Sequence, residues 1–373
     1  MISPAADTAH SVKDEAGRRW PVVDGVPFLR LGREELAAEA VARLDAGDRE
    51  GALVLLLADQ DSWWRGETAD PAALRELVRR RASLSLREAM RLLSWGPVAD
   101  YFAHRWSDPT FLSGLALVEA HWREPSSGFE LACGIGHHLR EWSRRGLRVA
   151  GADVVFAKLW LARHWVAPEA ELACFDAGAS WPLAPRAYDL VACHDAFYFL
   201  EPKPAILAKL REHVAPDGGV LAISHVHNRD WPNLSSGAAM TAAELAAAFP
   251  EAALYEDAEL TRALVERRPP RRAAAQEELA RVEAFSLAEG PGLAPAQAVT
   301  GRLALPPEGS PLRRNPLYAA DGTVRWPSER YAREYGPHAT YPARTECPER
   351  ATAGAATAAW ALRREMVDLP ERW

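Results

Sequence analysis

The sequence is poor in lysine and has no long apolar run. Only four of its 44 basic residues are lysines, namely Lys13, Lys158, Lys203 and Lys209. Acidic residues number 51, and the formal net charge is −7. This balance argues against a nucleic-acid surface built on bulk positive charge. Because no run of about 18 consecutive apolar residues occurs, the sequence also predicts no membrane span.

Cysteine is scarce as well. The chain has four cysteines, and no two of them have C-x-x-C spacing, so neither a zinc ribbon nor a dithiol redox motif is indicated. The first residues, MISPAADTAHSVKDEAGRR, contain no apolar core segment and do not form a signal-peptide pattern. We therefore expect a reduced, cytoplasmic protein.

The most informative stretch is Phe129–Val154, FELACGIGHHLREWSRRGLRVAGADV. It predicts a short strand that closes at Leu131, a turn of small residues and a helix over 137–145. A second strand over 147–150 follows, with Asp153 just past its end. This order predicts a βαβ nucleotide-binding unit whose ligand lies over the carboxyl ends of the strands.

The glycines of the turn separate two kinds of nucleotide site. A dinucleotide site favours G-x-G-x-x-G, in which the third glycine lets the helix approach a pyrophosphate. Here Gly134 and Gly136 are followed by Leu139 at the third position. The helix also begins with His137 and His138, whose rings would crowd a pyrophosphate. These features disfavour an NAD-dependent oxidoreductase.

The pattern E-x-A-C-G-x-G resembles the first motif of class I S-adenosylmethionine-dependent methyltransferases, in which D/E-x-G-x-G-x-G is usual. The resemblance implies that Glu130 orients the methionine part of S-adenosyl-L-methionine. It implies that Gly134 and Gly136 let the backbone pass close to this cofactor, and that Asp153 binds its ribose hydroxyls. Ala132 departs from the usual glycine but keeps a small side chain at the site.

The resemblance continues as far as His227, with its motifs in the family's order. Asp176 and Ala177, after a third strand, would contact the adenine. A fourth strand leads to His194 and Asp195, and a fifth covers 220–224. Further cofactor contacts are expected from Tyr101, Arg105, His137, Val154 and His194. The implied fold is α/β, a doubly wound, mostly parallel seven-stranded sheet of methyltransferase type.

Four regions are predicted around this fold. Residues 1–33 form a tail, disordered to about residue 14, and a small β-hairpin; residues 34–123 form a helical cap. Residues 124–300 form the Rossmann-like S-adenosylmethionine-binding domain, and residues 301–373 an irregular extension rich in proline, tyrosine and arginine. We expect this extension to wrap the domain or to build a subunit contact, and to end in a helix over 351–366.

Candidate catalytic residues follow the fourth and fifth strands. They are His194, Asp195, His225 and His227. His194 or His225 is the expected base, with Asp195 orienting or binding the substrate. Two other interpretations remain open. His225 and His227 share a strand face and could bind a metal together with Asp195 or His194, or the histidines could serve only packing. We favour the acid–base role and assign no metal ligand.

The sequence thus predicts a cytoplasmic S-adenosylmethionine-dependent methyltransferase that modifies an O, N or C atom of a small-molecule metabolite. A competing hypothesis is a non-catalytic protein that keeps the cofactor fold and serves as a partner subunit in a complex. The expected partner is a small-molecule acceptor, with no nucleic acid and no membrane. The C-terminal extension is the expected contact in any homo-oligomer.

Overall fold

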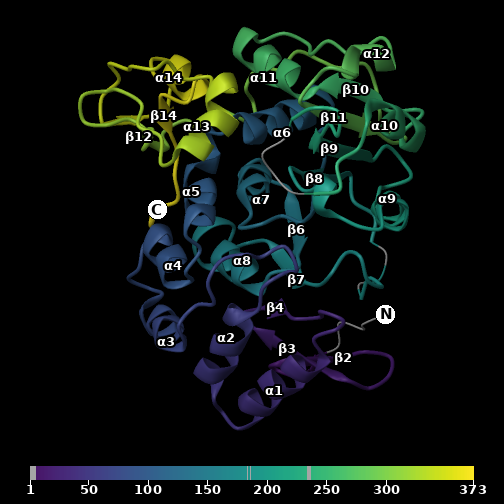
Figure 1. Cartoon of the computed structure of the whole chain (residues 1–373), viewed down its shortest axis with the longest axis vertical. Coiled ribbons are helices and arrows are strands. Elements are labelled where there is room, and N and C mark those ends of the chain that lie inside the picture. The colour runs from purple at the N-terminus through teal and green to yellow at the C-terminus, as the bar shows by residue number, and fades with distance from the viewer. Residues whose placement is uncertain (1–5, 183, 185, 233–236) are drawn as a thin grey trace.

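Seven strands form the central sheet of the computed structural model, which describes residues 6–182, 184, 186–232 and 237–373 (Figure 1). Their order in space is β10-β11-β9-β8-β5-β6-β7. Strands β5 to β9 run parallel, whereas β11 pairs antiparallel with both β9 and β10. The bounds are β5 Ser127–Leu131, β6 Arg148–Asp153, β7 Glu171–Cys174, β8 Leu190–His194, β9 Val220–His227, β10 Ala253–Glu256 and β11 Ala284–Glu289. The predicted doubly wound, mostly parallel sheet is confirmed.

Helices cover both faces of this sheet, so its central strands are buried along most of their length. All five residues of β5 are buried. The flanking helices are α6 Pro109–Ala120, α7 His137–Ser143, α8 Phe156–Leu161, α9 Lys203–Glu212, α10 Ala242–Ala248, α11 Asp257–Glu266 and α12 Gln276–Leu279. Shorter helical turns are η2 Ala162–Val166, a π-helix, and η3 Phe197–Phe199. Since β5 to β9 are parallel, their carboxyl ends meet at one edge of the sheet.

The N-terminal region is more ordered than predicted. Strands β1 Ala6–Thr8, β2 Ser11–Lys13, β3 Arg19–Val23 and β4 Val26–Pro27 form a four-stranded sheet. The expected disorder is therefore wrong for residues 6–14, because β2 pairs with β3. The predicted hairpin consists of β3 and β4, joined at Asp24 and Gly25. The Leu29 N–H donates to the Cys174 carbonyl at 2.7 Å, so this hairpin covers the open edge at β7.

Four helices occupy the first part of the predicted cap, between the left side and the bottom of Figure 1. They are α1 Glu34–Asp45, α2 Arg49–Ala58, α3 Pro71–Arg80 and α4 Leu86–Leu92. A capping box begins α4, since Ser85 and Glu88 exchange side-chain and backbone hydrogen bonds. Helix α5 Pro97–His104 and the 3-10 turn η1 Arg105–Ser107 then lead into α6.

The C-terminal extension contains a small sheet of its own. Strands β12 Pro311–Arg314, β13 Arg350–Thr352 and β14 Met366–Val367 are arranged in the order β13-β12-β14. The extension also contains α13 Glu329–Tyr335, η4 Gly336–His338 and α14 Ala358–Leu362. The predicted helix over 351–366 is wrong except at α14, because both ends of that segment pair with β12.

The chain end then crosses to the cap. Trp373 Nε1 donates to the Ala103 carbonyl at 2.9 Å, and Arg372 Nη2 donates to the His164 carbonyl at 2.7 Å. These bonds join the last residues to α5 and to the segment after α8. Within the part of the chain that the structure describes, no helix is long and apolar enough to cross a membrane.

Candidate active site

A cavity of about 630 Å³ opens at the carboxyl edge of the parallel strands. Its floor is the turn after β5 and the ends of β6, β7 and β8. One wall is the loop between α2 and α3, which contributes Asp61, Trp63 and Trp64. Helix α5 and the C-terminal helix α13 close the other side with Tyr101 and Tyr335. The cavity is therefore built jointly by the sheet, the cap and the C-terminal extension.

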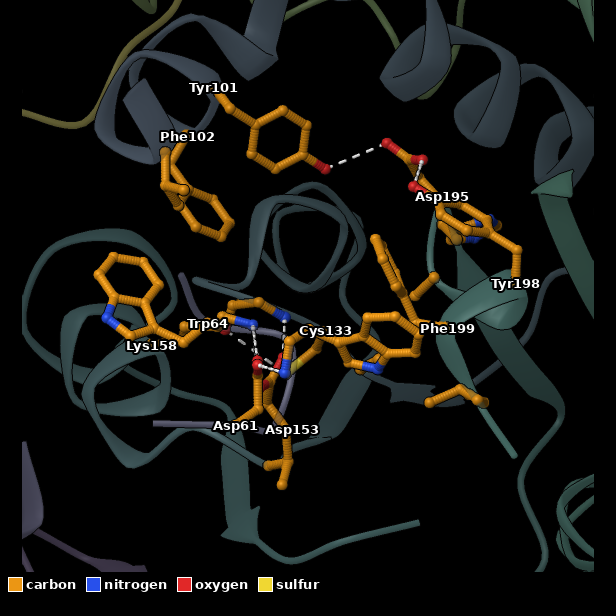
Figure 2. Close-up of a pocket in the computed structure, with 18 of the residues that line it drawn as sticks. Asp61, Trp64, Tyr101, Phe102, Cys133, Asp153, Lys158, Asp195, Tyr198 and Phe199 are labelled. Atoms are coloured by element: carbon orange, nitrogen blue, oxygen red, sulfur yellow. Dashed lines mark hydrogen bonds and ion pairs between the residues drawn. The ribbon is translucent and has the colours of Figure 1, made fainter. Parts of the chain in front are cut away.

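Asp153 fixes the turn after β5. Its Oδ2 accepts the Gly134 N–H at 3.0 Å, and its Oδ1 accepts the Val155 N–H at 2.9 Å. The ammonium of Lys158 lies 3.4 Å from Oδ1 and 3.9 Å from the Asp61 carboxylate. Burial alone would lower the pKa of Lys158, but Asp153 and Asp61 raise it, so this side chain remains an ammonium. Figure 2 shows Asp61, Asp153 and Lys158 grouped together beside the cavity.

The glycine turn fits a cofactor that lies against the backbone. Ala132 has a φ of +56° and Gly134 a φ of +56°, so the turn is left-handed at both positions. A Cβ at Gly134 would lie 3.1 Å from the Phe102 ring, a close approach that a larger residue would prevent.

The Asp153 carboxylate can accept one more hydrogen bond. A carboxylate has about four acceptor positions, and Asp153 uses two for backbone N–H groups and one for Lys158. One position remains for a ribose hydroxyl.

The predicted adenine contacts also lie at the cavity. Val154, Asp176 and Ala177 line it. The Gly178 N–H donates to Asp176 Oδ1 at 2.9 Å, and the Trp181 indole donates to the Ala177 carbonyl at 3.0 Å, which together hold this loop.

Gly136 is the member of the predicted cofactor set that lies outside the cavity lining. Its φ is +84°, and a Cβ there would lie 3.1 Å from the Cβ of Ala167. The glycine therefore allows the turn to pack closely on the segment after α8.

Asp195 joins the cap to the sheet. Its Oδ2 accepts from Arg105 Nη1 at 2.7 Å, from the Tyr101 hydroxyl at 3.1 Å and from the Thr110 hydroxyl at 3.2 Å. Its Oδ1 accepts from the Tyr198 hydroxyl at 3.1 Å. Burial would raise the pKa of Asp195, but Arg105 and nearby histidines hold it below its ordinary value. Asp195 is thus a buried anion, and both of its carboxylate oxygens already accept hydrogen bonds. Because its pKa is low, it is a weak base.

Tyr101 and Arg105 line the cavity, as a contact with the methionine carboxylate requires. Both side chains are nevertheless directed at Asp195, and Figure 2 shows the Tyr101 hydroxyl pointing to that carboxylate. In this arrangement they organise the junction between cap and sheet.

His225 and His227 lie behind Asp195, outside the cavity lining. His225 Nδ1 is 2.8 Å from Asp257 Oδ2. Burial would lower the pKa of His225, but the Asp257 and Asp195 carboxylates raise it to about 9, so the ring is an imidazolium at neutral pH. His227 stacks on the Tyr198 ring with centroids 3.9 Å apart. Burial, with the charge of His225, lowers the pKa of His227 to about 4.

His194 is the predicted catalytic histidine that reaches the cavity. Its Nδ1 lies 2.8 Å from Ser224 Oγ, while Nε2 has no partner among the described residues. Burial lowers the pKa of His194 well below its ordinary value, so the ring is neutral. His137 also lines the cavity, but its Nε2 is 3.0 Å from the Phe102 carbonyl and it packs among aromatic rings of the cap.

Several lining residues are absent from the predicted set. They are Trp63 and Trp64 from the cap loop, Lys158 from α8, Phe199 after β8, and Tyr331, Glu334 and Tyr335 from α13. Lys158 could have been noticed, because lysine is rare here and this one follows Asp153 closely in the sequence. The aromatic residues carry no local signal of this kind, since tertiary packing alone brings them to the cavity.

Comparison with known proteins shows which family this part of the chain resembles. Residues 129–218 match the family described as "Methyltransferase domain". The chain contains a methyltransferase domain. The predicted likeness to class I S-adenosylmethionine-dependent methyltransferases is thus confirmed for this part of the chain. No curated protein matches the whole chain or a part of it with significance.

Solved structures resemble the methyltransferase domain and its surroundings in part. The PH0226 protein from Pyrococcus horikoshii OT3 is 20% identical, with a TM-score of 0.28 over 30% of this chain and 51% of that one. CalS10, an amino pentose methyltransferase from Micromonospora echinaspora, is 19% identical, with a TM-score of 0.37 over 51% and 94%. A methyltransferase from Thiobacillus denitrificans is 18% identical, with a TM-score of 0.34 over 50% and 93%.

Proposed function

We propose that this methyltransferase domain transfers a methyl group to an O, N or C atom of a small-molecule acceptor. The observation that carries the proposal is the cavity of about 630 Å³ that is continuous with the Asp153 turn. Pockets of this size suit small ligands. Its walls come from the cap and from α13, so the parts of the chain outside the methyltransferase domain would select the acceptor.

The Asp153 side of the cavity would bind the cofactor. Asp153 would accept a ribose hydroxyl, and Asp176 with Ala177 would contact the adenine. The left-handed turn at Ala132 and Gly134 supports a close backbone approach there. When bound, S-adenosylmethionine supplies a methyl group on a positively charged sulfur. The chain's own part is then to position the acceptor in line with that methyl group.

The aromatic side of the cavity would bind the acceptor. Tyr101 and Tyr335 face each other with ring centroids 6.4 Å apart, and the Trp63 and Phe199 rings are 5.6 Å apart. Such rings bind planar or apolar groups and exclude water. Glu334, on the same helix as Tyr335, adds a carboxylate to the lining. These contacts favour an acceptor with an apolar body and a polar or basic group.

His194 is the proposed base. It is neutral, lines the cavity and carries an unpartnered Nε2. An acceptor hydroxyl or amine that donates to this nitrogen would lose its proton as the new bond to carbon forms. His225 is already an imidazolium at neutral pH, so its proposed role is to support the Asp195 anion and thereby the junction of cap and sheet.

Isothermal titration with S-adenosylhomocysteine tests the cofactor assignment directly. We expect one binding site per chain. Transfer of labelled methyl groups from S-adenosylmethionine to pooled metabolites, followed by mass spectrometry, then tests the acceptor class. Labelling of small molecules by the wild-type protein, with labelling lost in His194→Gln, supports the proposal. Absence of cofactor binding at hundreds of micromolar, or labelling only of protein or nucleic acid, would overturn it.

A further inference from the structure

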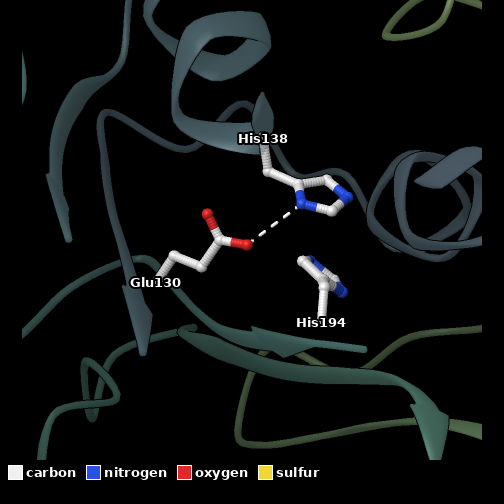
Figure 3. Close-up of side chains that lie close together, drawn as sticks. All are labelled: Glu130, His138 and His194. Carbon is white, nitrogen blue, oxygen red and sulfur yellow. Dashed lines mark hydrogen bonds and ion pairs between the residues drawn. The ribbon is translucent and has the colours of Figure 1, made fainter. Parts of the chain in front are cut away.

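Three ionisable side chains meet beneath the cavity floor, and Figure 3 shows them pointing toward one another. Glu130 lies on β5, His138 on α7 and His194 at the end of β8. Each of the three side chains offers one possible ligand atom, and these three atoms all lie within 4.8 Å of one another. His138 Nδ1 is 3.0 Å from Glu130 Oε1, and the two imidazole rings have centroids 4.2 Å apart.

This cluster is buried yet incompletely bonded. Glu130, His138 and His194 are only 2%, 3% and 4% exposed. Glu130 Oε2, His138 Nε2 and His194 Nε2 have no hydrogen-bond partner among the described residues, although all three side chains line the cavity. A buried polar atom without a partner is costly and uncommon in proteins. Three such atoms in one cluster point to a ligand that binds there.

We propose that Glu130, His138 and His194 bind a divalent first-row transition-metal ion. Two imidazoles and one carboxylate form a donor set that suits Zn²⁺, Fe²⁺ or Mn²⁺. Three protein ligands leave further coordination positions open toward the cavity, where water or an acceptor oxygen could bind. The ion would occupy the His194 Nε2 lone pair that serves as the base in the metal-free site. In the metal-bound protein the ion, and not the imidazole, would therefore lower the pKa of a bound acceptor hydroxyl.

Neighbouring groups hold both rings in place. Ser224 Oγ lies 2.8 Å from His194 Nδ1, which leaves Nε2 as the ligand atom, and such outer contacts orient the histidines of metal sites. Helix α6 closes the other side at Gly114. A Cβ at Gly114 would lie 2.7 Å from His138 Nε2 and 3.2 Å from His194 Nδ1. Glycine inside a helix is less favourable than alanine, and here it makes room for the two rings.

A second group of possible ligands, Asp195, His225 and His227, is less suitable. Arg105 lies 2.7 Å from the Asp195 carboxylate, and its charge would repel a cation bound to that carboxylate. His225 is protonated at neutral pH and already bonded to Asp257, so it lacks a free lone pair. The charge of Arg105 also reaches the Glu130 cluster, but no lysine or arginine of the described residues forms an ion pair with Glu130, because Arg105 is paired with Asp195.

The test is a titration of the untagged, metal-stripped full chain with Zn²⁺ and, separately, with Co²⁺. We expect one ion per chain by elemental analysis after gel filtration, and visible absorption bands of Co²⁺ in a nitrogen and oxygen environment. Glu130→Gln and His194→Asn each remove one ligand and should weaken Zn²⁺ binding at least tenfold. Ser224→Ala keeps all three ligands but frees the His194 ring, and should weaken binding by roughly 10-fold to 100-fold.

His225→Asn is the matched control, because it changes a histidine of the second group and should retain one tightly bound ion. Circular dichroism of each variant shows whether it is folded. Absence of Zn²⁺ and Co²⁺ binding in folded wild-type protein would overturn the proposal. So would binding that is lost in His225→Asn but kept in Glu130→Gln. Titration of S-adenosylhomocysteine without metal is independent of this result, so failure of the metal site and failure of the proposed methyl transfer can be told apart.

Discussion

The guanidinium of Arg105 lies 2.7 Å from the carboxylate of Asp195, and this ion pair joins the cap to the end of β8. The two side chains are 5% and 6% exposed. Replacing Arg105 by methionine would leave Asp195 as an uncompensated buried anion. Removing one partner of a buried pair costs about 3–5 kcal/mol. We expect Arg105→Met to lose about that much free energy of unfolding in urea, or to unfold.

Arg79→Met provides the control for this prediction. Arg79 forms an exposed ion pair with Glu50, which is screened by solvent, so its loss should change the stability little. If the two variants proved equally stable, the Arg105 pair would not be the junction between cap and sheet that the geometry indicates.

Ala132 adopts a left-handed backbone conformation that glycine tolerates better. Its φ is +56°, and such a conformation costs a residue with a Cβ about 1–2 kcal/mol. The greater entropy of glycine in the unfolded chain offsets about 0.4–1 kcal/mol of this. We expect Ala132→Gly to raise the free energy of unfolding by up to about 1 kcal/mol, measured in urea. Ala150→Gly, within β6, should instead lower it by roughly 0.5–1 kcal/mol. A destabilised Ala132→Gly would mean that the methyl group contributes packing that outweighs the strain.

His225 makes the stability of the protein depend on pH. Asp257 and Asp195 overcome the effect of burial and raise the pKa of His225 from 6.5 to about 9. A raised pKa stabilises the folded state fully below the unfolded value, and the gain is lost as the pH rises from about 6.5 through 9. A difference of about 2.5 units corresponds to about 3 kcal/mol. We therefore expect the stability difference between wild type and His225→Gln to shrink by about that amount between pH 6 and pH 10.

His121→Gln serves as the comparison for this pH series. Burial lowers the pKa of His121 to about 4, so the ring is neutral in the folded protein throughout the range. In the unfolded chain the ring titrates near pH 6.5. Its stability difference from wild type should therefore change only between pH 6 and about pH 8, in the opposite direction to that of His225→Gln, and should stay constant from pH 8 to pH 10. A pH-independent difference for His225→Gln would show that its ring is not protonated.

Asp153 should contribute to cofactor affinity through one charged hydrogen bond. Asp153→Asn keeps the size of the side chain but removes the negative charge of the carboxylate. This carboxylate accepts a hydrogen bond from the Gly134 N–H and would accept one from a ribose hydroxyl. Hydrogen bonds to charged groups contribute about 1.5–3 kcal/mol. We expect the affinity for S-adenosylhomocysteine to fall by roughly 10-fold to 100-fold in isothermal titration. Asp189→Asn, at the opposite edge of the sheet, should leave the affinity unchanged. Equal affinities in the two variants would remove the ribose assignment.

The sequence predicted the core of this fold well. Short apolar strands, the small residues at Ala132 to Gly136, and acids at Glu130 and Asp153 follow local patterns, and local patterns are visible in a single sequence. The parallel sheet then follows, because apolar strands separated by helices can be buried only in that arrangement. The prediction failed where strands pair across a long stretch of sequence. The composition of residues 351–366 predicted a helix, but both ends of this segment pair with β12.

The site divides in the same way. The sequence by itself determined that carboxylates and histidines end the parallel strands, since those positions follow from chain order and strand spacing. Only the tertiary structure decided their chemistry. It placed Arg105 against Asp195, Asp257 against His225, and Glu130 with His138 beside His194. Contacts between residues distant in sequence, and the burial that comes with them, set proton states and free ligand atoms, and no local pattern records either one.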